Sequence, residues 1–420
     1  MATGTTVDIR MYNVGFGDAF VVTVKRGAKR WRALIDCGVH SHGAARPIEQ
    51  TVAAIVADLK ADTPAGADHL DVVVATHHHA DHITGFAVDL WATVTVGEVW
   101  VSFVEDPSDA DGKALRARHQ AVTARLSGLI DTRTSALGPG EAAPELTLAA
   151  ALVANSRGND RAMARLLGTL APSFAKAHKV RYLPSTTAAA NDIATPVPGA
   201  IVHVFGPSRD PDQLKRMDPP VSAGWLPLDP DGTTVALDAG PIFNERRFAM
   251  GADELTAHPE LTASHRALAN LHGLNDAGLL AAASVLEQSV NNTSVFLVLE
   301  VGRKHFCFPG DAQQGAWDHV LGDPVARAML ADAVFYKISH HGSQNGTPRE
   351  FVEQVLTGTD GNAMLPWGLV EQWKNTIPNS SLLDALGTRR HILRADRPVA
   401  APPSVAVHDT MWSQISYRVH

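Results

Sequence analysis

Short apolar runs, separated by turn residues, occupy the start of the chain and predict β-strands. Apolar residues alternate or cluster in five such runs, at 7–14, 18–25, 31–36, 71–75 and 96–104. Residues 48–59 differ, because Val52, Ile55 and Leu59 recur there at helical spacing. The pattern therefore predicts a β-meander, a helix and two further strands.

The middle of the chain has a helical pattern that interrupts the strands. Helical spacing covers residues 113 to about 130, and an Ala- and Leu-rich stretch follows over 145–170. Strands return at 200–205 and 294–309, with a further helical region, 264–287, between them. Strand-rich blocks that alternate with helices in both halves of the chain predict an α+β fold.

One folded unit with insertions explains the length of the chain better than two separate domains. The chain has 420 residues, enough for two average domains, but the motifs described below extend from Asp18 to His341. We predict an N-terminal half, a helical insertion, a C-terminal half that carries a second helical insertion at about 207–290, and a linker with a final strand at 412–419. The bounds of these four parts are 1–104, 105–194, 195–397 and 398–420.

Composition and charge exclude some partners and leave others open. The formal net charge of −8 gives the whole molecule no attraction to a polyanion, so binding of long nucleic acid would need a local basic groove. Cys37 and Cys307 lie in strand-like runs, which favours reduced, buried thiols and a cytoplasmic location. No apolar run approaches about 18 residues, so we expect no membrane segment. The sequence leaves the oligomeric state undecided.

Residues 76–82, directly after an apolar strand, carry the strongest chemical signal. His77 and His79 are two residues apart, so both can point to one ion, and Asp81 with His82 can reach a second ion. Neutral imidazoles with carboxylates suit zinc, and also manganese or iron, whereas the lack of thiolates argues against a closed structural zinc site. The segment is internal, which argues against the remnant of an affinity tag.

The pattern His77-x-His79-x-Asp81-His82 resembles the metal-binding signature of the metallo-β-lactamase superfamily. Further motifs, each at a predicted strand end, are similar to the ComEC-like branch, the metal-dependent domain of bacterial DNA-uptake proteins and its soluble relatives. These motifs are Asn13–Ala19, Ala33–Gly38, Asn291–Ser294, Gly310–Ala312 and His340–Ser343. The resemblance covers roughly residues 7–104 and 195–350, and it extends to the metal domain alone, without the membrane channel.

The resemblance implies a fold and a set of ligands. The fold is a metallo-β-lactamase αββα sandwich, with two zinc ions at one edge between the sheets and the mostly helical insertion over that edge. Asp311 would bridge the ions, although a Pro-Gly-Asp turn is an alternative. His340 would be the closing imidazole and His341 would contact substrate, or the reverse. The expected ligands are His77, His79, Asp81, His82, Asp311 and His340, and the expected catalytic residues are Asp81, Asp311 and His341.

Four polar residues near these motifs are candidates for orienting ligands or contacting substrate. Asp18 and Asp36 are expected to orient ligands or loops, because metal-bound histidines commonly donate their second N–H to a carboxylate. Each of them could instead form only a cap or a turn. Asn292 and Ser343 could bind substrate, or they could tie a loop to backbone groups.

Other histidines raise two questions that the sequence leaves open. His78 lies between two expected ligands and should point the other way if strand geometry persists. Many superfamily members also supply a further histidine before the bridging aspartate, although the ComEC-like pattern does not clearly require it. His203 lies in an apolar run, which favours a hydrogen-bonded strand histidine. The candidates in this chain are His119, His178, His203, His258, His265, His272 and His305.

Two neighbouring ions that activate a shared water indicate hydrolysis. We expect a metal-dependent hydrolase with phosphodiester or nucleotide-type substrates, because the motifs are most similar to that branch. Hydrolysis of a lactone, amide or other ester is the enzymatic alternative, and a metal-binding or degenerate scaffold is the non-enzymatic one. Arg157, Arg161 and Arg165 recur every four residues and could form a cationic stripe, directed either to a phosphate-bearing substrate or to acidic surface partners.

Overall fold

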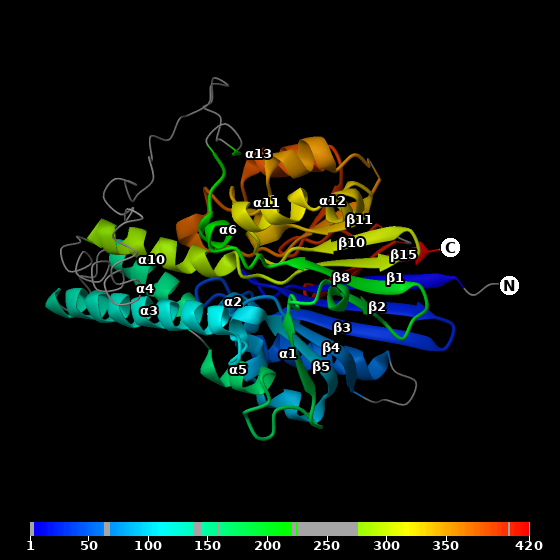
Figure 1. Ribbon diagram of the computed structural model, residues 1–420, viewed down its shortest axis with the longest axis horizontal. Coiled ribbons are helices and arrows are strands. Elements are labelled where there is room, and N and C mark those ends of the chain that lie inside the picture. The colour runs from blue at the N-terminus through cyan, green and yellow to red at the C-terminus, as the bar shows by residue number, and fades with distance from the viewer. Residues whose placement is uncertain are drawn as a thin grey trace.

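Two mixed β-sheets face each other in this α+β fold, and helices lie on their outer sides (Figure 1). The computed structural model describes residues 4–62, 68–137, 144–157, 159–220, 224–225, 276–358, 360–401 and 404–419. No helix within these ranges is long and apolar enough to cross a membrane. Cys37 and Cys307 are both free and buried, as predicted.

The first sheet contains eight strands within the described ranges, most of them from the N-terminal part of the chain. Their bounds are β1 Thr5–Tyr12, β2 Ala19–Arg26, β3 Lys29–Cys37, β4 His69–Ala75, β5 Thr95–Ser102, β6 Lys179–Leu183, β14 Val405–His408 and β15 Trp412–Val419. The order is β14-β15-β1-β2-β3-β4-β5-β6. β4 has a continuous apolar run because it lies between β3 and β5, parallel to both, and is buried on both faces.

The second sheet contains seven strands in the described part of the chain. Their bounds are β7 Asp192–Ala194, β8 Ala200–Gly206, β9 Phe296–Val301, β10 Lys304–Phe308, β11 Ala333–Lys337, β12 Asn362–Leu365 and β13 His391–Arg394. The order is β13-β12-β11-β10-β9-β8-β7. β9 and β10 form a tight hairpin in which Gly302 adopts φ 61°, a conformation that favours glycine.

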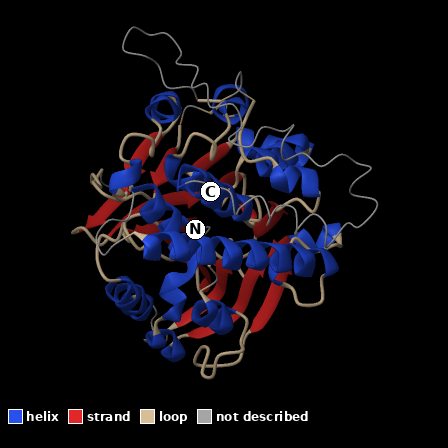
Figure 2. Ribbon diagram, turned by 90° about the vertical axis from the view of Figure 1, so that its left-hand side faces the viewer, coloured by secondary structure: helices blue, strands red, loops and turns tan. Residues whose placement is uncertain are grey.

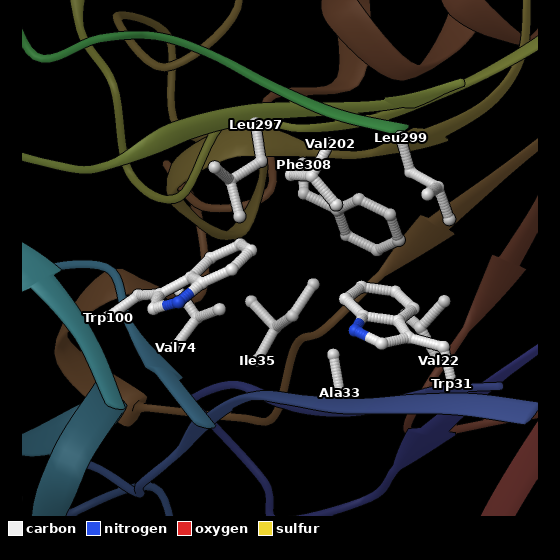
Figure 3. A pocket seen from close by; sticks show the side chains of 10 residues that line it. All are labelled: Val22, Trp31, Ala33, Ile35, Val74, Trp100, Val202, Leu297, Leu299 and Phe308. Atoms are coloured by element: carbon white, nitrogen blue, oxygen red, sulfur yellow. The ribbon is translucent and has the colours of Figure 1, made fainter. Parts of the chain in front are cut away.

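The main hydrophobic core lies between the two sheets. Trp31 and Trp100 from the first sheet face Leu297 and Phe308 from the second, and these side chains line a small pocket (Figure 3). All ten residues that line this pocket are apolar, so it offers no group for polar recognition or acid–base chemistry. We therefore interpret it as a packing feature of the core rather than as a substrate site.

Helices cover the outer face of each sheet. Those packed on the first sheet are α1 Ile48–Ala61, α2 Ala80–Ile83 and α5 Asp160–Leu166. Those packed on the second are α11 Gln314–Gly322, α12 Pro324–Ala331 and α13 Ser380–Gly387, with the short α6 Pro211–Lys215 beside α11. α1 buries Val52, Ile55 and Leu59, the residues whose spacing predicted it. Single turns of 3₁₀ or π helix occur at 84–87, 89–93, 103–105, 188–191, 339–342, 351–355 and 371–373.

Three longer helices form a bundle with a core of its own at one end of the molecule. They are α3 Ala110–Ala136, α4 Pro144–Ser156 and α10 Asp276–Asn291, and they bury Leu126, Leu152 and Leu286 against one another. Figure 1 shows the bundle at the left, and Figure 2 looks at this end, where helices cross in front of the two sheets. α4 contacts α2, and the Asn155 side chain accepts a hydrogen bond from the backbone N–H of Asp81. The bundle therefore lies against the histidine-rich segment.

Two predicted divisions of the chain contain strands that extend the sheets. Residues 105–194 are not helical throughout, because β6 extends the first sheet and β7 the second. In residues 398–420, the predicted final strand is β15, which pairs with β1, and β14 precedes it and pairs with β15. Backbone groups at a sheet edge need partners, and these segments supply them. Of the second predicted helical insertion, 226–275 lie outside the described residues, together with His258, His265 and His272.

Candidate metal centre

Strand ends from both sheets bring the candidate ligands together. Asp36 lies near the end of β3, and the segment 76–82 follows β4. In the second sheet, Asp311 comes shortly after β10, and His340 with His341 comes after β11. β3 runs parallel to β4, and β10 runs parallel to β11, so each pair of strands ends at one edge of its sheet. Loops placed on a rigid scaffold in this way are where binding and catalytic residues are commonly found.

Four buried side chains at this edge form a group that could hold a metal ion. They are Asp81, His82, Asp311 and His341, and their ligand atoms lie within 4.8 Å of one another. His82 Nε2 is 3.0 Å from Asp311 Oδ2, and His341 Nε2 is 3.4 Å from the same oxygen. His341 Nε2 is also 3.3 Å from Asp81 Oδ2. Asp311 Oδ2 is thus the point where imidazoles from the two halves of the chain meet.

Asp36 occupies the position expected of an orienting carboxylate. Its Oδ2 accepts a hydrogen bond from His82 Nδ1 at 2.8 Å, and its Oδ1 accepts one from the backbone N–H of Thr76 at 2.8 Å. Asp36 has φ 55°, an unusual conformation for a residue other than glycine, and these bonds hold it there. Asp18, Asp36 and His82 form a second buried group with close ligand atoms.

His77 and His79 face each other beside the group of four. His77 Nε2 lies 3.0 Å from His79 Nδ1, and the His77 and His82 ring centroids are 4.1 Å apart. The other ring nitrogen of His77 lies 3.1 Å from Thr76 Oγ1 and 3.2 Å from Ser294 Oγ. These two hydroxyls fix the ring and leave His77 Nε2 as the nitrogen available to an ion.

The structure reverses the positions expected for His340 and His341. His340 is directed to Ser343 Oγ, 2.7 Å from its Nδ1, and to the Asn291 amide, 3.2 Å from its Nε2. His341 donates from Nδ1 to the Pro366 carbonyl at 2.8 Å, which leaves Nε2 facing the two carboxylates of the group. Both histidines have positive φ, 46° and 50°. The turn after β11 therefore sets the directions of the two side chains. The alternation of the strand, which favoured His340 as the ligand, does not extend into this turn.

Lys337, at the end of β11, is a buried site residue that the sequence pattern did not reveal. Its Nζ lies 2.6 Å from Asp18 Oδ2, and it donates to Asp311 Oδ1 at 2.9 Å and to the Gly310 carbonyl at 2.8 Å. This lysine engages one oxygen of Asp311, so the other oxygen is presented to the imidazoles. The signal in the sequence was a lone lysine at the end of an apolar strand, shortly before the pair of histidines at 340–341.

Glu287, on α10, is a second site residue that the sequence pattern did not reveal. Its side chain is 12% exposed, and its Oε1 lies 4.0 Å from His79 Nδ1. Burial, together with the charges of Asp81 and Asp311, raises the pKa of Glu287 to about 8. The signal in the sequence was an acidic residue among the apolar positions of the predicted helix 264–287.

Asn292 and Ser343, expected to contact substrate or tie loops, are engaged within the protein. The Asn292 amide donates to the carbonyls of Leu214 and Arg216, at 3.1 and 2.8 Å, and its oxygen accepts from backbone N–H groups after β10. Asn292 therefore ties loops together, which is the second of its two predicted roles. Ser343 bonds to His340 and helps to hold that ring away from the group of four.

His78 and His203 also have partners outside the group of four. His78 Nδ1 lies 2.9 Å from Glu105 Oε1, which agrees with the prediction that His78 points away from its two neighbours. His203 lies between two carboxylates, with its ring nitrogens 2.7 Å from Asp192 and 2.9 Å from Glu300. It is a hydrogen-bonded strand histidine, as its apolar surroundings favoured.

The charges of the group shift the pKa values of its members in opposite directions. Burial lowers the pKa of His82, but Asp311 and the other carboxylates outweigh burial and raise it well above its ordinary value. The same balance raises the pKa of His341. Burial raises the pKa values of Asp81 and Asp311, but the imidazoles outweigh it and hold both well below the ordinary range.

The donor set fits a metal ion. Asp81 Oδ1 and His341 Nε2 are buried and make no hydrogen bond, although a buried polar atom without a partner costs about 1–3 kcal/mol. A cation between them would satisfy both atoms. Imidazoles and carboxylates without thiolates suit zinc, manganese or iron. The buried Asp and His cluster could therefore bind a metal ion.

Comparisons with known proteins add no family to these observations. No model of a known protein family matches the chain, and no curated protein matches it. The functional argument therefore depends on the residues and on the geometry described above.

Proposed function

We propose that this chain is a metal-dependent hydrolase of the metallo-β-lactamase superfamily, with a site for two zinc ions. The observation that carries the proposal is the buried group of Asp81, His82, Asp311 and His341, with His77 and His79 beside it. Helices on both outer sides of two facing sheets support the same proposal, because the sequence motifs implied that arrangement.

Residues of the chain divide into two sets around the proposed ions. His77 and His79 would hold one ion, and Asp81, His82 and His341 would hold the other, with Asp311 as a ligand beside both sets. Two bound ions would supply activation of a water, orientation of the scissile group and stabilisation of developing negative charge.

The protein residues would then orient the water and fix the geometry of the site. Burial raises the pKa of Asp81, but the imidazoles hold it well below the ordinary range, so Asp81 would stay ionised and orient an attacking water through its carboxylate. Asp36 holds the ring of His82, and Lys337 holds Asp311, so neither group needs to reorganise during the reaction. Asp311 would serve as an anchor between the two halves of the chain rather than as a proton acceptor.

Phosphodiesters or nucleotide-type molecules are the proposed substrates. The sequence motifs support this class, because the branch that they resemble is the metal domain of DNA-uptake proteins. The proposed arginine stripe gives no support to it. Arg161 pairs with Asp89, and Arg165 is buried against Asp89 and the Phe86 carbonyl.

An uncharged ester, lactone or amide is the second candidate substrate class, favoured by the engagement of cations near the site. Lys337 contacts the candidate ligands directly, but Asp18 and Asp311 already neutralise it. Lys337 therefore offers a phosphate group no positive charge in addition to that of the proposed ions. The two substrate classes therefore differ in a way that a direct assay separates.

Metal analysis with a substrate screen tests the proposal. The purified protein should contain metal and hydrolyse bis-p-nitrophenyl phosphate, single-stranded DNA or a cyclic nucleotide in preference to lactones and β-lactams. Activity on lactones alone would favour the second candidate. If the protein bound metal but hydrolysed none of these substrates, the result would favour the non-enzymatic alternative, a metal-binding scaffold.

The variant Asp311→Asn tests the role of Asp311 in the proposed site. It should keep the fold, lose turnover by at least about 100-fold and lose much of one metal ion, because the amide replaces the charge between the two imidazoles. Asp212→Asn, on the exposed surface of α6, is the control and should behave as the wild type. Wild-type turnover in Asp311→Asn would remove Asp311 from the mechanism.

A further inference from the structure

α10 brings an acidic side chain from the helical bundle to the metal centre. Glu287 is 12% exposed, on a helix whose neighbouring residues Leu286 and Val290 are buried. A carboxylate in such surroundings is costly unless a cation or hydrogen-bond donors compensate it. Its contact with the site is with His79, whose Nδ1 lies 4.0 Å from Glu287 Oε1.

The neighbouring imidazoles have the geometry of two ligands that need a third. His77 Nε2 and His79 Nδ1 are 3.0 Å apart. Two ligands at about 2.0–2.1 Å on the corners of a tetrahedron stand about 3.3 Å apart, so both nitrogens suit one ion. The distance from His79 Nδ1 to Glu287 Oε1, 4.0 Å, is wider, so the Glu287 side chain would have to rotate to place its oxygen on the same ion.

Three further histidines in the described part of the chain have other neighbours. His203 is held by Asp192 and Glu300, and His178 Nε2 lies 2.8 Å from the Leu166 carbonyl. The His119 ring lies beside His78, with the two ring centroids 5.2 Å apart. Glu287 has a ligand oxygen beside His79.

We infer that Glu287 is a protein ligand for the ion held by His77 and His79. The inference rests on the proposed metal centre and deepens it, because it makes the helical bundle part of that centre. The insertion then supplies a ligand as well as a cover. A carboxylate in place of a further imidazole also gives this ion a harder and more negative ligand set.

Glu287→Gln tests the inference through metal binding. Metal-free wild type and variant are titrated with Zn²⁺ in competition with a chromophoric chelator, and Co²⁺ spectra report on the ligand set. Glu300→Gln is the matched control, because Glu300 also contacts a histidine but lies away from the site. We expect two ions in the wild type and in the control. In Glu287→Gln we expect one ion to bind at least about 10-fold more weakly and the Co²⁺ bands to change.

The outcomes separate this inference from the proposed function. Two ions of unchanged affinity in Glu287→Gln, with unchanged Co²⁺ bands, would overturn the role of Glu287 and leave the proposed function intact. No bound metal in the wild type would overturn both. If Glu287→Gln does not fold, Glu287→Asp, which keeps the charge on a shorter side chain, should weaken the same ion, and wild-type affinities there would also overturn the inference.

Discussion

A proton and a bound metal ion would compete for the Nε2 atom of His82. This ring bonds to Asp36 through Nδ1 and to Asp311 through Nε2. Burial lowers the pKa of His82, but the surrounding carboxylates raise it well above its ordinary value. The stability that this shift contributes is fully present below pH about 6.5 and is lost as the pH rises through the raised pKa.

Metal binding should therefore release protons at neutral pH. An ion that binds His82 Nε2 must displace the proton which the raised pKa keeps there, so the metal affinity should rise with pH between about 6 and 8. Calorimetric titrations with Zn²⁺, in buffers of different ionisation enthalpy, measure the number of protons released. Heats that do not depend on the buffer would contradict this account.

Single residues of the site differ in how far the sequence reveals them. The histidine-rich segment and Asp311 are visible because ligand types recur at strand ends. Lys337 and Glu287 are not, because each looks like an ordinary charged residue until the fold buries it. The choice between His340 and His341 depends on two positive φ angles, which a strand pattern does not encode.

Among the elements, α5 shows what the predicted arginine stripe does. Arg157 follows α4, whereas Arg161 and Arg165 lie on α5, so the three residues do not share one helix. Arg165 is fully buried and donates to the Phe86 and Pro172 carbonyls and to Asp89. The arginines on α5 therefore attach this helix to the outer face of the first sheet.

Arg165→Ala and Arg161→Ala should have unequal effects on stability. Loss of the buried Arg165 leaves several carbonyls without donors and should cost about 2–4 kcal/mol of unfolding free energy. Loss of Arg161, whose side chain is 53% exposed, should cost under about 1 kcal/mol. Urea denaturation measures both, and neither variant should change KM for a phosphodiester. A raised KM in folded Arg161→Ala would restore the stripe as a substrate site.

At the scale of elements, periodicity predicts the strands and helices better than their grouping. The predicted final strand has the bounds of β15, and the first five predicted strands match β1 to β5 within a few residues. The packing of α10 against α3 and α4 could not be predicted. A long stretch of chain separates α10 from α4, and an apolar helix face does not specify which helix packs against it. β6 was hidden inside a helical segment because it is short and only partly buried.

In the whole molecule, the candidate ligands join the two halves of the chain. Asp81 and His82 lie in a loop of the first sheet, and Asp311 and His341 lie in loops of the second sheet. An ion at this edge would bind the native arrangement and not the unfolded chain, so it would stabilise the fold as a whole.

Metal removal should lower the melting temperature by several degrees. At a free metal concentration about 1,000 times the Kd, binding contributes about 4 kcal/mol, and dialysis against a chelator should remove that contribution. Scanning calorimetry before and after chelation, and after return of Zn²⁺, measures the effect. An unchanged melting temperature in protein shown to have lost its metal would mean that the ion does not join the halves.

The pairing of β1 with β15 affects how the chain folds during synthesis. β1 pairs with β2 as soon as both are made, but its other edge waits for residues 412–419. Until then the unpaired N–H and C=O groups of that edge can accept a strand from another chain. The newly made protein is therefore open to aggregation in the interval when the other strands of the first sheet exist and β15 does not.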